Sequence, residues 1–159
     1  GILIVEDLSD KYTNNLFKKN NLIFNPLFNT VSHLFVGSHH PLACKKTVTK
    51  NDIVKYPYIT YEQGENNSMQ FSEELLEPFA YEKNIKINDR ATLLNLLLAT
   101  DSCTVGTGIM ISKLNNGSII SIPIENGKSY TIGYISKADF KLSENALKFI
   151  EIIKEIVPK

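Results

Sequence analysis

Polar side chains suited to capturing a small polar molecule gather in two segments of this chain. The first segment spans residues 60–68 and holds Thr60, Glu62, Gln63, Asn66 and Ser68. The second follows a short apolar strand and holds Asn88 and Arg90, just ahead of a leucine-rich run. Each segment opens a predicted helix, and a helix N-terminus presents unpaired N–H groups and a partial positive charge. These two segments are therefore candidates for binding carboxylate, sulfate or other polar oxygens.

Several of these side chains also fit purely structural roles. Ser68, Asn88 and Asp89 are residue types that cap helices, and the Gln63-Gly64 pair is typical of a turn. Arg90 is equally consistent with a surface ion pair. Both interpretations stay open at the level of sequence.

The exit from the leucine-rich helix supplies two further candidates. Thr104 and Thr107 accompany Gly106 and Gly108, which follow the helix at the start of another strand. The threonine hydroxyls are candidate ligand contacts. The two glycines favour tight strand–helix packing over ligand contact, because a residue without Cβ allows close approach.

No pattern typical of catalysis or of a metal site accompanies these residues. Three histidines and a cysteine lie between His33 and Cys44, but their spacing matches no recognised zinc motif. Neither Cys103 nor any serine lies in a G-x-S-x-G elbow. Glu73 and Glu74 are consecutive, so on a helix they point apart. We predict a binding protein, not an enzyme, with no catalytic residues, no metal and no cofactor.

Alternating strand and helix signals position the polar segments. Residues 56–61, 85–87 and 105–111 are predicted strands, and the segments between them are predicted helices, from about Ser68 to Glu77 and over 91–101. This alternation indicates right-handed crossovers and a mostly parallel sheet. Strand–helix junctions in such sheets are where α/β proteins bind small ligands.

Further elements flank this unit and predict a second lobe. Strands are expected at 1–5, 22–28, 31–36, 118–124 and 130–136, with a short helix near 12–17, a helical turn at 50–54 and a final helix at 144–157 capped by Ser143. The final helix must pack on a sheet, and the N-terminal sheet is the nearest. We therefore expect lobe I to comprise residues 1–50 and 129–159, and lobe II to comprise residues 51–128.

Composition narrows the class of protein. The chain has 159 residues with 17 basic and 17 acidic side chains, and a neutral chain without a basic stripe argues against direct nucleic-acid binding. The two cysteines lack a pairing signature, which is typical of free thiols in a reducing cytosol. No apolar run or signal peptide suggests a membrane, so we expect a cytoplasmic location. The start at Gly1, without Met, indicates a fragment of a longer protein.

Several motifs in order resemble one known family. Leu34-Phe35-Val36, His40-Pro41-Leu42-Ala43 and Tyr56-Pro57-Tyr58-Ile59 resemble the effector-binding domain of LysR-type transcriptional regulators. The run from Asp89 to Leu97 and the sequence Gly106-Thr107-Gly108-Ile109 are similar to the second lobe of the same domain. The resemblance covers nearly the whole chain.

The resemblance implies a fold and a function. The implied fold is α/β and of the type II periplasmic-binding-protein kind, with two lobes and mixed, mostly parallel sheets. Gly1-Ile2-Leu3-Ile4 resembles the family's third strand, so lobe I is expected to be truncated at its N-terminus. A small-molecule effector is expected to bind between the lobes and to alter DNA binding by an N-terminal helix-turn-helix that this chain lacks. The full-length protein is expected to be a homodimer or tetramer, with no membrane contact.

Three other functions remain open from sequence alone. The first is a solute-binding protein of a transport system, which has the same fold and cleft. The second is an enzyme built on this scaffold, which would need a cysteine or threonine in a catalytic context. The third is a dimerisation module that binds no metabolite.

Overall fold

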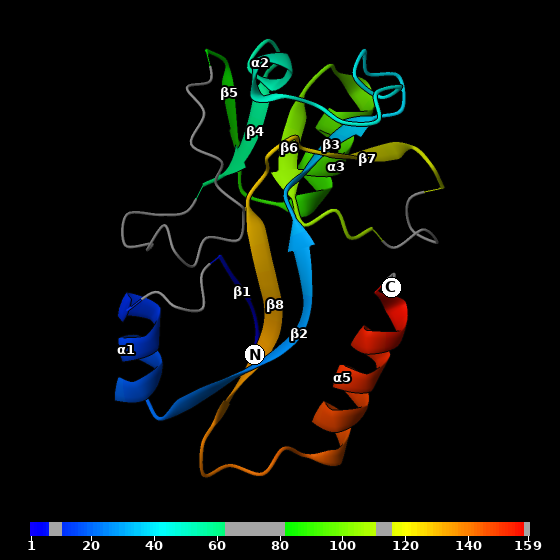
Figure 1. Ribbon diagram of the computed structural model, residues 1–159. Coiled ribbons are helices and arrows are strands. Elements are labelled where there is room, and N and C mark those ends of the chain that lie inside the picture. The colour runs from blue at the N-terminus through cyan, green and yellow to red at the C-terminus, as the bar shows by residue number, and fades with distance from the viewer. Residues whose placement is uncertain (7–10, 63–81, 111–115, 158–159) are drawn as a thin grey trace. The chain divides into compact units, whose positions relative to one another are not determined.

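Two compact units make up the chain in the computed structural model, which describes residues 1–6, 11–62, 82–110 and 116–157 (Figure 1). Unit 1 comprises Gly1–Thr30 and Ser129–Lys159, and unit 2 comprises Val31–Lys128. Residues 31–50 were predicted to lie in lobe I, but the structure groups them with unit 2. The reason is strand β3, His33–Gly37, which pairs with a strand of unit 2 on each side.

A three-stranded sheet forms the centre of unit 1. Its strand order is β1-β8-β2, with β1 at Ile2–Val5, β8 at Ser129–Lys137 and β2 at Leu22–Val31. Strands β1 and β8 are antiparallel. Helix α1, Lys11–Lys19, is longer than the short helix predicted near residues 12–17. The ring of its Phe17 stacks on that of Phe24 in β2, with centroids 6.1 Å apart.

The last helix, α5, spans Glu144–Ile156 and begins as the sequence predicted. The Ser143 hydroxyl accepts a hydrogen bond from the Ala146 N–H at 3.3 Å, so the predicted cap is confirmed. Ile150 is buried, whereas Leu147 and Ile156, which the sequence placed on the same packed face, are about half exposed. None of the helices among the described residues has the length and apolar character to cross a bilayer.

A five-stranded sheet forms unit 2, in the order β5-β4-β6-β3-β7. Strands β4 (Tyr58–Tyr61), β5 (Asn84–Ile87) and β6 (Cys103–Gly106) run parallel, which confirms the parallel sheet predicted for this stretch. Strand β3 is antiparallel to both β6 and β7 (Ile119–Pro123), so the sheet as a whole is mixed. Helix α2, Lys50–Ile53, is the predicted single turn.

Helix α3, Arg90–Ala99, covers one face of this sheet and closes its core. Leu93 and Leu97 of α3 pack with Ile59, Ile87 and Ile119 from three strands. Leu93 and Leu97 therefore form core, as apolar composition predicts, whereas Leu94 and Leu98 of the same run are exposed. The helix predicted between Ser68 and Glu77 lies outside the described residues.

Candidate ligand-binding edge of unit 2

Parallel pairing places the described start of the first polar segment, Thr60 to Glu62, at the same edge of the unit 2 sheet as the second segment. Thr60 pairs with Lys86 and Tyr61 with Ile87, so β4 and β5 end side by side. The Glu62 N–H then donates to the Ile87 carbonyl at 2.7 Å, which joins the two segments directly. Because ligands of open α/β sheets bind beyond the carboxyl ends of parallel strands, this edge is the candidate site.

The described residues of the first segment offer both acceptors and a charge. Thr60 is half-buried, and its hydroxyl donates to the Asn84 side-chain oxygen at 3.0 Å, leaving its lone pairs able to accept. Glu62 and Asn88 are exposed beside it. Gln63, Asn66 and Ser68, the other candidates from this segment, lie outside the described residues.

The N-terminus of α3 already holds a carboxylate of the chain itself. Asp89 accepts hydrogen bonds from the Thr92 N–H at 2.8 Å and from the Thr92 hydroxyl at 2.5 Å. These bonds hold the pKa of Asp89 below its usual value. Asp89 therefore caps the helix, which is one of the two roles left open by the sequence. An anion at this helix end would have to compete with Asp89, so the edge favours a ligand that also carries hydrogen-bond donors.

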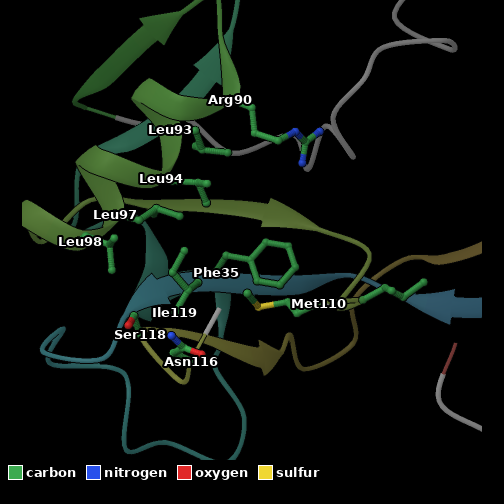
Figure 2. Close-up of a pocket in the computed structure, with 11 residues that line it drawn as sticks. Phe35, Arg90, Leu93, Leu94, Leu97, Leu98, Met110, Asn116, Ser118 and Ile119 are labelled. Carbon is green, nitrogen blue, oxygen red and sulfur yellow. The ribbon is translucent and has the colours of Figure 1, made fainter. Parts of the chain in front are cut away.

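Arg90 is the first residue of α3 and is exposed at the same edge. No ion pair of Arg90 occurs among the residues that the structure describes, so the surface ion-pair interpretation finds no support there. Its side chain extends along a pocket lined by α3 leucines (Figure 2). Arg90 thus places a cation at the start of α3 and on the lining of that pocket.

The two threonines near β6 are engaged within the fold. Thr104 is 4% exposed, and its hydroxyl donates to the Ile59 carbonyl at 3.0 Å, which satisfies a buried polar group between β6 and β4. The half-buried Thr107 hydroxyl accepts from the Ile109 N–H at 3.4 Å. A structural role thus accounts for both side chains, and contact with ligand remains a prediction for them.

The glycines that follow α3 pack against side chains of β3, not against a helix. A Cβ at Gly106 would lie 2.4 Å from the Phe35 ring, and one at Gly108 would lie 2.4 Å from the His33 ring. Gly108 also has a φ of +78°, which L-residues with side chains rarely adopt. Close packing is confirmed for both glycines, but they pack against side chains of a strand and not against the helix that the sequence predicted.

His40 holds the turn after β3 against the end of α3, a role that the sequence did not reveal. The residue is 3% exposed, and its Nδ1 accepts from the Leu42 N–H at 3.0 Å. Its other ring nitrogen, Nε2, therefore carries the proton and donates to the Asp101 carbonyl at 3.1 Å. Burial lowers the pKa of His40. Among the described residues, no three His, Cys, Asp or Glu side chains are grouped to hold a metal ion.

One family model matches most of the chain. The model for the LysR substrate binding domain matches residues 13–157. No curated protein matches the chain.

Solved structures of similar fold come from the same family. The regulatory domain of MetR, a LysR family regulator from N. meningitidis, is 17% identical with a TM-score of 0.59, over 97% of this chain and 69% of that one. A putative LysR family regulator from Pseudomonas aeruginosa is 13% identical with a TM-score of 0.62, over 99% and 53%. The effector binding domain of QuiR in complex with shikimate is 17% identical with a TM-score of 0.55, over 96% and 69%. At these identities the likeness shows a shared fold.

Proposed function

Because the chain belongs to the LysR substrate binding domain family, we propose that it senses a small polar metabolite for a bacterial transcriptional regulator. In this proposal the metabolite binds without being transformed. Its binding shifts an existing conformational equilibrium, and a DNA-binding domain elsewhere in the regulator responds. Within unit 2, the part of the site that we propose is the edge where β4 and β5 end.

The hydrogen bond from Glu62 to Ile87 is the observation that carries the proposal. The bond joins the ends of two parallel strands. The residues at or just after those ends supply hydrogen-bond acceptors, a carboxylate and a cation, namely Thr60, Glu62, Asn88 and Arg90. An acidic and a basic residue at one sheet edge complement a ligand that carries both signs of charge. An amino acid or a related sulfur compound is therefore the ligand class that we propose, ahead of a simple anion.

The other parts of the function follow from the family. We propose a cytoplasmic protein that is a homodimer or tetramer at full length and contacts DNA only through its N-terminal domain. We also propose that the domain has no enzymatic activity. The reported family and structural matches give no support to a solute-binding transport protein.

A thermal-shift screen of amino acids, sulfur compounds and organic acids tests the proposal. A ligand present at 100 times its dissociation constant stabilises the folded state by about 2.7 kcal/mol. That gain should raise the melting temperature by several degrees. Thr60→Val should remove most of the rise, because it deletes a polar contact at the edge.

A matched substitution separates binding from stability. Thr131 in β8 is also half-buried, and its hydroxyl donates to the Asn29 side-chain oxygen at 3.0 Å, the same kind of bond that Thr60 makes. Thr131→Val should keep the full ligand-induced rise. A hit that Thr60→Val and Thr131→Val weaken equally would argue against the edge as the site. If no compound in the three classes raises the melting temperature, the sensor proposal fails.

A further inference from the structure

Unit 2 contains an apolar pocket that is separate from the proposed effector site. Arg90, at one end of the pocket, is the residue that the two share. The pocket has a volume of about 480 Å³ and lies between α3 and the strands β3 and β7 (Figure 2). Leucines of α3 form one wall, and Phe35, Met110 and Ile119 form the facing wall. We call this cavity the α3 pocket.

Helix α3 carries more apolar surface than the sheet beneath it buries. Leu93 and Leu97 are 8% and 1% exposed and pack on the sheet. Leu94 and Leu98 are 41% and 44% exposed and line the α3 pocket. A surface helix normally shows one apolar stripe toward its core. Leu94 and Leu98, four positions apart, form a second apolar stripe on α3, and this stripe borders a cavity.

The polar groups of the α3 pocket stand at its two ends. Arg90 is the only charged side chain among the described residues that line it, and it lies one helical turn before Leu94. Asn116 and Ser118 lie at the other end. A guanidinium at the end of an apolar cavity complements a carboxylate attached to a hydrocarbon body. No described lining residue carries a negative charge that would oppose such a ligand.

We propose that the α3 pocket is a second ligand site, which binds a small apolar carboxylate. The hydrocarbon body packs between the α3 leucines and the Phe35 and Ile119 side chains, and the carboxylate pairs with Arg90. The volume falls within the range of about 300–1,000 Å³ typical of small-molecule sites. The second site differs from the effector edge in its chemistry, because it selects for hydrocarbon where the edge selects for polar groups.

Calorimetric titration of the chain with octanoate and decanoate, below their micelle-forming concentrations, measures this binding. Each buried methylene contributes about 0.8 kcal/mol, so the two additional methylenes of decanoate should make it bind roughly 15-fold tighter than octanoate. Octanol serves as the uncharged probe. Arg90→Gln should weaken decanoate binding by about tenfold or more, since a hydrogen bond to a charged group is lost, and should leave octanol binding unchanged.

Matched variants locate the site independently of the effector edge. Leu94→Glu places a carboxylate at the rim of the α3 pocket and should abolish decanoate binding. Leu147→Glu makes the same change at an exposed helical leucine of unit 1, 47% exposed against 41% for Leu94, and should bind decanoate normally. Leu98→Gln provides a second pocket variant in case Leu94→Glu lowers stability. The metabolite response at Thr60 should survive Leu94→Glu, so failure of one proposal is distinguishable from failure of the other.

Three results would overturn the second site. The first is the absence of saturable decanoate binding. The second is equal weakening by Leu94→Glu and Leu147→Glu, which would indicate adsorption to any apolar surface. The third is a dimer that Leu94→Glu converts to a monomer and that binds no decanoate, because the α3 pocket would then be covered by a second copy of the chain.

Discussion

The two cysteines should differ in thiol reactivity, because one is buried and the other is exposed. Cys103 is fully buried in β6, and burial raises the pKa of its thiol to about 12, whereas Cys44 is exposed. The thiolate is the reactive form. A disulfide-exchange reagent such as DTNB should therefore titrate one thiol per native chain and two per chain in denaturant.

Cys44→Ser provides the control for the thiol prediction. The variant should show no fast-reacting thiol when native and one thiol when unfolded. Fast native reaction of Cys103 in this variant would mean that β6 opens readily, contrary to the packing of its neighbours in the sheet.

His40 predicts a pH dependence of stability. Burial lowers its pKa below the ordinary value of 6.5, so the unfolded chain binds a proton more readily than the folded chain does. The His40 contribution to stability is complete above pH 6.5 and is lost as the pH falls from 6.5 through the folded-state pKa. Urea unfolding between pH 5 and 7.5 should show this loss of unfolding free energy.

His40→Gln should flatten that pH profile while lowering stability at pH 7.5. The unchanged chain supplies the comparison, and its slope between pH 5 and 6.5 should exceed that of His40→Gln. A slope that persists in His40→Gln would contradict the assignment of the neutral ring between Leu42 and Asp101.

Residue type predicted the helix caps, but the side-chain neighbours of β3 could not be predicted. Ser143 and Asp89 are typical capping residues at helix starts, and both cap as local chemistry requires. The neighbours of Gly106 and Gly108 come from β3, about 70 residues earlier in the chain. Only strand order and register place Phe35 and His33 there, and neither follows from local sequence.

Helix α2 shows how much a very short element depends on its caps. The Thr49 hydroxyl accepts from the Asp52 N–H, and Asp52 accepts in return from the Thr49 N–H at 3.0 Å and from Lys45 at 2.8 Å. Asp52→Asn should therefore lower the free energy of unfolding by about 1 kcal/mol, because hydrogen bonds to a carboxylate are stronger than those to a neutral amide. Chemical denaturation at pH 7 measures the change.

The Lys45 contribution to that effect can be separated. Lys45→Gln keeps the capping box and removes only an exposed ion pair, which is worth about 0–1 kcal/mol. A larger loss from Lys45→Gln than from Asp52→Asn would show that the capping box contributes little.

Element types were predictable where hydrophobic periodicity is local, and element partners were not. Strands β4 and β5 and helix α3 were predicted within a few residues, and their alternation predicted parallel pairing correctly. Strand β6 was predicted at residues 105–111 but lies at Cys103–Gly106. The candidate edge followed from that pairing. Strand β3 was predicted as a strand but assigned to the wrong unit, because an apolar strand is compatible with either sheet.

The chain passes between unit 1 and unit 2 twice, near residues 31 and 128, and hydrogen bonds join the two passing segments. The Ser32 N–H donates to the Lys128 carbonyl at 2.9 Å, and the Ile124 N–H donates to the Ser32 carbonyl at 3.1 Å. The chain therefore enters and leaves unit 2 at one place. A boundary near residue 50, which the sequence suggested, would instead remove β3 from between β6 and β7.

We predict that residues 31–128 fold as an independent unit. The five-stranded sheet and its α3 cover are retained in this fragment, and its two ends are already joined by the Ser32–Lys128 bond. The fragment should give dispersed amide resonances and a cooperative thermal transition. Residues 51–128, the lobe predicted from sequence, provide the matched comparison and should not fold.

The physical reason lies in β3, whose Leu34 and Val36 are 0% exposed. Burying such a side chain contributes about 1.5–3 kcal/mol, which is a large share of the 5–15 kcal/mol that stabilises a typical domain. Without β3, strands β6 and β7 also lose every hydrogen bond that they make to it. A cooperative transition in residues 51–128 would mean that the remaining strands fold without β3. The boundary near residue 50 would then describe the folding unit better.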